Sequence, residues 1–444
     1  MKYKRVMIAA TGSGTGKTTI TCGLLAALKN AGMKPCSFKC GPDYIDPMFH
    51  RNVIGVASGN LDTFFTDADT TKRLFVDEYD GDIALIEGVM GLYDGIGGTS
   101  STGSSYDLAR VLDIPIVLVV NGRGMGRSIL AEIKGFLDYD EHHLIKAVIL
   151  NRVSKSFGNT LTDLIEKELG IKVIGCIENC QDVSIDSRHL GLVLPNEIET
   201  INEKLSIVAS IVEAGVDIEG LKKISEEALD ININAQDNIV NTKRLRLAVA
   251  RDEAFCFYYK ENLRMLEKMG VELLFFSPIH DKKLPDDIEG ILLGGGYPEN
   301  FLKELSINVE MKASIKNAIN SGMPIIAECG GFMYLLDSIV GMDNKSYQMV
   351  GALNGSCTFK GKLVRFGYVT IEKENTFFIK GHEFHYYDTD NNGEDLVITK
   401  ASTGKSMKAM HYDGKLCVGF PHLYYPSSPD FVENFLEAMR EYGK

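Results

Sequence analysis

The 444-residue sequence lacks any long hydrophobic run, because no apolar stretch approaches the roughly 18 residues that a membrane-spanning helix needs. Residues 1–5 lead into an apolar strand pattern, in place of the apolar segment and cleavage site of a secretory signal. Positive charge is scarce, since 47 Lys and Arg stand against 60 Asp and Glu, a net charge of -13. We therefore expect a cytoplasmic protein that binds neither membranes nor nucleic acid, although this charge leaves room for a local basic site that binds an acidic small molecule.

The nine cysteines show no disulfide framework, because their number is odd and their spacing is scattered. Cys36 and Cys40, like Cys176 and Cys180, are spaced as C-x-x-x-C and not as the C-x-x-C of zinc sites, and no histidine pair accompanies them. We expect reduced thiols, most of them buried as small hydrophobic side chains. A hydrophobic content of 45% and a charged content of 24% indicate an ordinary globular protein, long enough for two or three domains.

A glycine-rich segment, residues 10–19, lies between an apolar strand pattern at 6–9 and an amphipathic helical pattern that starts at Ile20. Glycines allow consecutive backbone N–H groups to surround an anion, and the helix N-terminus adds partial positive charge. In such a loop Lys17 reaches the outer phosphates of a nucleoside triphosphate, and the Thr18 hydroxyl takes a place on Mg²⁺. The strict pattern G-x-x-x-x-G-K-[ST] would need glycine at position 11, where this sequence has threonine. The predicted nucleotide-binding residues of this loop are Gly12, Gly14, Thr15, Gly16, Lys17, Thr18 and Thr19.

The first half alternates apolar strands with helices, which predicts an α/β fold with a parallel sheet covered on both faces. From about residue 201 to 244 the sequence becomes polar, and we expect an interdomain connection there. The predicted boundary near residue 240 separates a domain at 1–240 from a second α/β domain at 241–444, whose sheet pattern restarts at 245–250. The strands expected in the first half cover residues 34–39, 82–86, 114–120, 145–150 and 171–177.

Carboxylates follow two of these strands, and ligands of such sheets gather beyond the carboxyl ends of the strands. Asp43 and Asp46 lie in a loop with prolines, where they either hold Mg²⁺, orient an attacking group, or simply form turns. Glu87 ends an apolar strand and is the best candidate for a metal ligand. Asp94 lies in the glycine-rich loop that follows Glu87, a loop that can close over a substrate.

Three further polar residues of the first half are candidates for ligand binding. Asn151 ends the strand at 145–150, where its amide can read the edge of an adenine, although a helix cap or turn is an equally good interpretation. Arg188 and His189 can bind an anionic substrate, and the alternative is a solvated loop.

The second half carries a cysteine whose surroundings are typical of a nucleophile. Cys329 comes at a strand-to-helix turn before two glycines, where we expect an exposed thiol whose thiolate is favoured by the helix N-terminus. His422, just after the strand pattern at 416–418, is the expected base. The triple-glycine loop at 294–296 offers N–H groups to an oxyanion. Tyr424 stands where a carboxylate normally orients the imidazole, so either a dyad suffices or another acid serves.

Taken together, these segments resemble the cobyrinic acid a,c-diamide synthases of cobalamin biosynthesis, over essentially the whole chain. The resemblance implies an N-terminal domain similar to dethiobiotin synthetase and a C-terminal class I, or triad-type, glutamine amidotransferase domain. Its carrying segments are residues 11–19, 39–47, 87–95, 187–192, 250–255, 294–299, 328–331 and 382–386.

The resemblance implies a ligase that amidates the a and c carboxylates of a corrinoid ring, with ATP and L-glutamine as co-substrates and Mg²⁺ as cofactor. ATP would convert each carboxylate into an acyl phosphate, and ammonia released from glutamine through a thioester on Cys329 would displace the phosphate. Because ammonium is not nucleophilic, we expect the ammonia to travel between the domains on a path shielded from water. The implied roles are acyl-phosphate chemistry for Asp43, Asp46 and Asp94, metal binding for Thr18, Glu87 and Asp43, and oxyanion binding for Gly295 and Gly296. We further hypothesise that His382 and His385 help hold the tetrapyrrole or complete the interdomain site, and that Arg188 and His189 are substrate contacts.

Other interpretations stay open. Amidation of nickel sirohydrochlorin, on the route to coenzyme F430, uses a very similar enzyme, and no residue here separates the two substrates. Cobyric acid synthase amidates other corrinoid side chains, but the loop at 41–47 favours the a,c-diamide type. A partitioning-type ATPase that dimerises would usually carry an extra lysine where this chain has Gly12, and would leave the second half unexplained. A homodimer is compatible with all of these interpretations.

Overall fold

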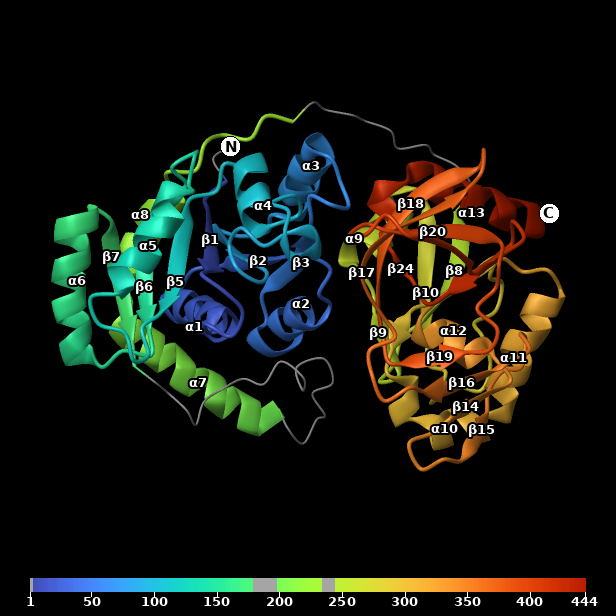
Figure 1. Ribbon diagram of the computed structural model, residues 1–444. Helices are drawn as coiled ribbons and strands as arrows, with labels where there is room; N and C mark the ends of the chain where they lie inside the picture. The colour runs from blue at the N-terminus through green and yellow to red at the C-terminus, as the bar shows by residue number, and fades with distance from the viewer. Residues whose placement is uncertain (1–2, 179–197, 234–243) are drawn as a thin grey trace. The chain divides into compact units, whose positions relative to one another are not determined.

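The computed structural model describes residues 3–178, 198–233 and 244–444 (Figure 1). The chain divides into two compact units, Met1–Ala235 and Gln236–Lys444, here called the N-terminal and C-terminal units. The predicted boundary near residue 240 lies outside the described residues. Among the described residues, no helix is both long enough and apolar enough to cross a bilayer.

Within the described residues, the N-terminal unit is built on a seven-stranded parallel sheet with strand order β3-β2-β4-β1-β5-β6-β7. Its strands are nearly continuous apolar runs because both faces of the sheet are buried. The α/β class predicted from the sequence is confirmed. The strands are β1 (Arg5–Ala10), β2 (Pro35–Cys40), β3 (Ala57–Leu61), β4 (Ile83–Glu87), β5 (Ile116–Asn121), β6 (Ile145–Asn151) and β7 (Lys172–Ile177).

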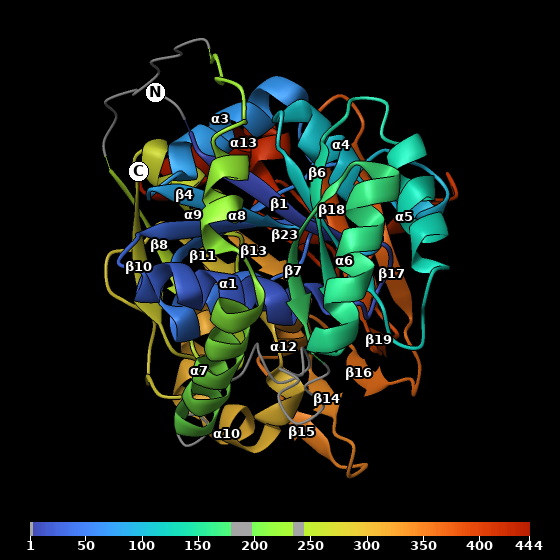
Figure 2. The ribbon, with the colours of Figure 1, turned by 90° about the vertical axis from the view of Figure 1, so that its left-hand side faces the viewer.

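Helices cover both faces of this sheet, and the alternation of side chains along each strand divides the core in two (Figure 2). Val6 and Ile8 of β1 face α1, α7 and α8, whereas Met7 faces the opposite layer of α3 to α6. The helices are α1 (Lys17–Asn30), α2 (Ile45–Phe49), α3 (Ala68–Glu78), α4 (Ser105–Val111), α5 (Ile129–Asp138), α6 (Lys155–Leu169), α7 (Ile198–Gly215) and α8 (Ile218–Ser225), with a π-turn η1 (His50–Ile54) and a 3₁₀ turn η2 (Ile96–Gly98).

The expectation that residues 201–244 form a connection was wrong for its first part. Helices α7 and α8 bury Val208, Val212 and Leu221 in the same core cluster as α1. The segment looked polar because α7 is amphipathic and carries its charges on the exposed face.

The C-terminal unit has two layers of sheet with a core between them. One layer is a six-stranded sheet in which only β22 runs antiparallel, and the other is a five-stranded antiparallel sheet. Within the described residues the orders are β10-β8-β11-β13-β23-β22 and β21-β20-β17-β18-β24, with smaller sheets β15-β14-β16-β19 and β12-β9. The other face of the six-stranded sheet packs on a second core cluster that includes α10, α11 and α12.

The strands of the C-terminal unit are β8 (Leu245–Ala250), β9 (Phe255–Phe257), β10 (Val271–Phe276), β11 (Gly290–Leu293), β12 (Gly295–Gly296), β13 (Ile325–Glu328), β14 (Ser338–Val340), β15 (Ser346–Gln348), β16 (Ser356–Phe359), β17 (Arg365–Lys373), β18 (Phe377–His385), β19 (Tyr387–Thr389), β20 (Leu396–Lys400), β21 (Ser406–Ala409), β22 (His411–Tyr412), β23 (Leu416–Gly419) and β24 (His422–Leu423). Its helices are α9 (Lys260–Lys268), α10 (Leu302–Ile307), α11 (Val309–Asn320), α12 (Gly330–Leu335) and α13 (Pro429–Tyr442), with 3₁₀ turns η4 (Pro298–Asn300) and η5 (Tyr425–Ser427).

Candidate functional site

The glycine-rich loop connects β1 to α1, as the sequence predicts. Gly14 and Gly16 have φ values of 74° and 99°, in the left-handed region that glycine adopts without strain. A side chain on Gly16 would meet the amide nitrogen of Asn151 at 2.3 Å. Lys17 reaches across the loop, and its Nζ donates to the carbonyl of Met90 at 2.5 Å. Burial, together with the nearby charge of Lys39, lowers the pKa of Lys17 to about 8.

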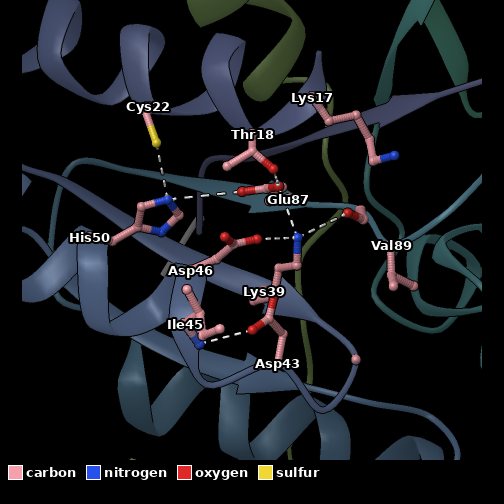
Figure 3. Close-up of polar contacts among 12 residues, drawn as sticks. Lys17, Thr18, Cys22, Lys39, Asp43, Ile45, Asp46, His50, Glu87 and Val89 are labelled. Atoms are coloured by element: carbon pink, nitrogen blue, oxygen red, sulfur yellow. Dashed lines mark hydrogen bonds and ion pairs between the residues drawn. The ribbon is translucent and has the colours of Figure 1, made fainter. Parts of the chain in front are cut away.

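A buried lysine stands next to this loop. Lys39 lies one residue before the end of β2 and is the register partner of Glu87 at the end of β4. Its Nζ lies 2.5 Å from Asp46 Oδ2 and 2.8 Å from Glu87 Oε1, between the two carboxylates (Figure 3). Burial opposes its charge, but Asp46, Glu87 and Asp43 outweigh burial and raise the pKa of Lys39 well above the ordinary value. The lysine is therefore a permanent cation at the carboxyl edge of the sheet.

The two carboxylates respond differently to the same surroundings. Burial favours protonation of Asp46, yet the charge and hydrogen bond of Lys39 hold its pKa below the ordinary value. Burial and the charge of Asp46 raise the pKa of Glu87. His50 lies 3.8 Å from the second oxygen of Glu87, and burial lowers the pKa of this histidine to about 4, so the ring is neutral at physiological pH. These residues form one electrostatic cluster, in which Lys39 pairs with Asp46 and Glu87 and the charges of both acids also act on Lys17.

The donor set fits a Mg²⁺ ion. The Thr18 hydroxyl donates to Glu87 Oε1 at 2.6 Å, so the predicted hydroxyl and carboxylate ligands lie side by side. Glu87 Oε2 is buried and has no hydrogen-bond partner among the described residues. An oxygen pair of this kind is the hard ligand set that Mg²⁺ prefers together with substrate phosphates. Asp43, the third predicted ligand, enters the same electrostatic network, since the charge of Lys39 acts on its carboxyl group.

The remaining predicted residues of the N-terminal unit lie around this cluster. Asp43 Oδ1 accepts a hydrogen bond from the amide of Ile45, and burial followed by the charge of Asp46 raises the pKa of Asp43 to about 7. Asp94 Oδ2 accepts from the amide of Gly91, in the loop after β4. Asn151 donates from its amide to the Thr15 carbonyl at 2.7 Å, so here it holds the phosphate loop, and its reading of adenine stays a prediction.

Cys329 forms a strained elbow between β13 and α12, with φ 46° and ψ -104°. A positive φ is rare for a residue with a side chain and is found at nucleophile elbows. The structure corrects two expectations about this thiol, because its side chain is buried and its pKa is raised. Burial is the main cause, and the charges of Glu299, Glu328 and Glu383 act in the same direction. The short helix α12, six residues long, does not overcome these effects.

His422 and the triple-glycine loop lie against this elbow. A Cβ on Gly295 would come within 2.3 Å of His422 Cε1, and a Cβ on Gly330 would lie 3.2 Å from the Gly296 nitrogen. The loop of Gly295 and Gly296 therefore approaches both the imidazole and the start of α12, and its role in binding an oxyanion stays a prediction. Only glycine permits this close approach.

His422 is embedded in a cluster of buried side chains. Its ring stacks on His382 with centroids 4.9 Å apart, and the Tyr259 hydroxyl lies 3.0 Å from His382 Nδ1. Burial, followed by the charge of His422, keeps the pKa of His382 well below the ordinary value. His422 Nδ1 lies 3.8 Å from Glu328 Oε2. His382 is therefore in direct contact with His422, the predicted base.

His385 lies in the same unit, on the opposite face of β18. Its ring stacks on Phe420 with centroids 4.0 Å apart, and its Nδ1 lies 2.7 Å from the Tyr387 carbonyl. Its Nε2 lies 3.8 Å from Glu383, which also pairs with Arg365. His382 and His385 are both buried, and their proposed contacts with a tetrapyrrole stay predictions.

Sequence reasoning gave no role to Lys39, His50, Glu328 or Glu299. A signal existed for Lys39, because a lysine inside a buried strand is rare unless it is paired. None existed for Glu328, whose partner is far along the chain. Arg188 and His189 lie outside the described residues.

Residues 6–193 match the CobQ/CobB/MinD/ParA nucleotide binding domain family, and residues 246–419 match the CobB/CobQ-like glutamine amidotransferase domain family. The cobyrinate a,c-diamide synthase of Caldanaerobacter subterraneus subsp. tengcongensis is 40% identical over 99% of this chain and 99% of the relative. The cobyrinate a,c-diamide synthase of Priestia megaterium is 38% identical over 99% of this chain and 98% of the relative.

Two solved structures are similar to parts of the chain. The MinD cell division protein of Aquifex aeolicus matches 52% of this chain and 100% of its own, with 15% identity and a TM-score of 0.32. A crystal structure of a glutamine amidotransferase matches 44% of this chain and 98% of its own, with 16% identity and a TM-score of 0.33.

Proposed function

The chain belongs to the cobyrinate a,c-diamide synthase family, and from this membership we propose that it amidates the a and c side-chain carboxylates of cobyrinate. It is a glutamine-dependent amidotransferase ligase, with ATP as the source of energy and glutamine as the source of nitrogen. The observation that carries the proposal is the presence, on one chain, of a phosphate loop beside buried acids and of a cysteine elbow beside a histidine.

In the N-terminal unit, ATP activates the carboxylate. A carboxylate oxygen of the substrate attacks the γ-phosphorus of ATP, the bond to the β-phosphate oxygen breaks, and ADP leaves. Ammonia then attacks the acyl carbon, loses a proton, and inorganic phosphate departs with the carbon–oxygen bonding pair. Lys17 and Lys39 are the two cations that we assign to this chemistry. Their positive charges stabilise the negative charge on the phosphoryl oxygens and on the departing phosphate.

Thr18, Glu87 and Asp43 are the residues that would hold Mg²⁺, which neutralises phosphate charge when it is bound. Asp46 has a different role in this scheme. Its carboxylate is the partner that keeps Lys39 charged and directed at the edge of the sheet. Asp94, beside Lys17 and Gly91, stays proposed as a residue near the acyl phosphate.

In the C-terminal unit, Cys329 and His422 release ammonia from glutamine. The cysteine sulfur attacks the amide carbon while His422 takes the thiol proton, and the developing oxyanion is met by the loop of Gly295 and Gly296. The proton returns to the departing nitrogen, ammonia leaves, and water hydrolyses the thioester to glutamate and free thiol. Because burial raises the pKa of the Cys329 thiol, attack requires proton transfer to the imidazole.

One experiment tests the substrate assignment. The purified chain is given ATP, Mg²⁺ and glutamine with either cobyrinate or nickel sirohydrochlorin, and the products are weighed by mass spectrometry. The proposal expects two successive amidations of cobyrinate, each replacing a hydroxyl by an amino group, with matching amounts of ADP and glutamate. Amidation of nickel sirohydrochlorin alone would contradict the proposal.

A further inference from the structure

The histidine of the C-terminal unit lacks an acid at its customary place in the sequence. Two residues after His422 stands Tyr424, a buried side chain whose ring packs edge-on against Tyr259 with centroids 5.1 Å apart. A phenol at this place cannot offer the negative charge that orients and stabilises an imidazolium.

A carboxylate approaches His422 from a different strand. Glu328 ends β13, its side chain is 6% exposed, and its Oε2 lies 3.8 Å from His422 Nδ1. The other oxygen accepts from the Tyr425 hydroxyl at 3.4 Å, and the Leu423 amide also interacts with this carboxyl group. The carboxylate is thus held on one side by the backbone and the phenol, and it faces the imidazole on the other.

Strand pairing explains this arrangement. Glu328 is the register partner of Gly419 at the end of β23, and the chain from Gly419 leads within three residues to His422. The next residue after Glu328 is Cys329, whose positive φ turns the backbone away from the strand direction. The predicted nucleophile and the carboxylate that faces His422 therefore come from one dipeptide.

We propose that Glu328 is the positioning residue of His422: as an ionised carboxylate it accepts a hydrogen bond from Nδ1–H, leaves Nε2 free to take the thiol proton, and stabilises the imidazolium that forms. The inference rests on the proposed glutamine hydrolysis at Cys329 and extends it, because it assigns the acid that Tyr424 cannot supply.

The other groups that face His422 are consistent with this role. His382 stacks on the imidazole from β18 and stays neutral, and the backbone of Gly295 in β12 lies close to the ring. Burial raises the pKa of Glu328, whereas His422, the Leu423 amide and Tyr425 act in the opposite direction and favour its ionised form.

The test uses the full chain and compares Glu328→Gln with Glu328→Asp. Glutamine hydrolysis is followed as glutamate release over a range of pH. For Glu328→Gln we expect kcat to fall by about 100-fold or more with little change in KM, as for loss of an aligned acid–base partner. The acidic limb of the kcat/KM profile moves to lower pH, because the imidazolium of His422 no longer has a negative carboxylate beside it and forms only at lower pH. Glu328→Asp keeps the charge, recovers a large part of kcat, and leaves the limb near its original place.

Asp252→Asn is the matched control. Asp252 is a carboxylate of the same unit that accepts hydrogen bonds from Ser277 and the Ile279 amide. Asp252→Asn therefore shows how removal of a carboxylate elsewhere in the unit affects glutamine hydrolysis. We expect it to leave the pH profile unchanged. Ammonia-dependent synthesis, measured in each preparation, should stay at the wild-type rate.

Three outcomes overturn the proposal: a wild-type profile in Glu328→Gln, an equal loss of kcat in Glu328→Asp and Glu328→Gln, or the same limb shift in Asp252→Asn. A wild-type chain that makes amide from ammonia but never hydrolyses glutamine would instead refute the proposed function of the C-terminal unit, and this inference with it.

Discussion

Replacing Lys39 by methionine removes the one cation that joins Asp46 and Glu87. Methionine is unbranched like lysine but one atom shorter and uncharged, so two buried carboxylates are left facing each other where the lysine Nζ had been 2.5 Å and 2.8 Å from them. Breaking a buried pair of this kind costs about 3–5 kcal/mol, and for a unit of this size that corresponds to a melting temperature lower by roughly 6–20 °C.

The loss depends on pH, and its sign follows from the pKa shifts. In the wild type Lys39 lowers the pKa of Asp46. The pair of Asp46 and Lys39 therefore stabilises the folded state from neutral pH to below the ordinary pKa of an aspartate, and this stabilisation is lost only as pH falls through the lowered pKa. In Lys39→Met the same carboxyl, and Glu87 with it, has a raised pKa and gains stability by taking up protons as pH falls. The difference in stability between the two proteins is therefore largest near pH 7 and shrinks toward pH 5.

Hydrogen exchange read by mass spectrometry suits this measurement. The chain has no tryptophan, so fluorescence does not distinguish the units, whereas peptides from each unit are resolved separately. Peptides of the C-terminal unit should exchange as in the wild type. The control is Lys34→Met, which removes an exposed ion pair with Asp80 and should leave exchange unchanged. Equal protection in Lys39→Met and wild type at pH 7, or a deficit that stays constant down to pH 5, would refute the reasoning.

Three further predictions follow from the two sites. Cys329→Ala should abolish synthesis from glutamine and spare synthesis from ammonia, whereas Lys17→Ala should stop both. The product is identified by its mass. Loss of ammonia-driven synthesis in Cys329→Ala would contradict the assignment of glutamine hydrolysis to one unit and carboxylate activation to the other. Because burial lowers the pKa of Lys17 to about 8, ATP should bind with uptake of a proton near pH 8, and its affinity should fall by up to about tenfold per pH unit above that. Calorimetry in buffers of different ionisation enthalpy measures the uptake, and buffer-independent heats would disprove it. The pKa of Asp43 is raised to about 7, so its protonated form favours folding at low pH, and this effect is lost as pH rises through 7. Asp43→Asn should therefore stabilise the N-terminal unit by up to about 2 kcal/mol at pH 8 and not at pH 4. Thermal melts at the two pH values test this, and destabilisation at pH 8 would count against it.

The parts of the structure that the sequence predicted are those fixed by short-range pattern. The phosphate loop, the buried parallel strands and the elbow at Cys329 each follow from glycines or apolar runs within a few residues. Ligands of such sheets gather beyond the carboxyl ends of the strands, which placed Glu87 beside Thr18. Glu87 ends β4, and Thr18 lies at the start of α1, directly after the loop that follows the neighbouring strand β1.

The parts that were missed depend on strand register and packing. The contact of Lys39 with Glu87 needs the alignment of β2 with β4, and the approach of Glu328 to His422 needs that of β13 with β23. Glu328 and His422 are 94 positions apart and carry no local sign of such a contact. The thiol of Cys329 was expected to be exposed because a turn after a strand usually lies at the surface, and here the side chain is buried, with the Gly296 nitrogen close to the next residue, Gly330.

The amide of Asn151 donates to the carbonyl of Thr15, and a methyl group on Gly16 would collide with it. The end of β6 is therefore joined directly to the phosphate loop. If the same amide also meets the base, a nucleotide with the wrong base has to disturb the loop that grips its phosphates. Selectivity for adenine would then show itself in the rate of phosphoryl transfer, and not only in how tightly the nucleotide is held.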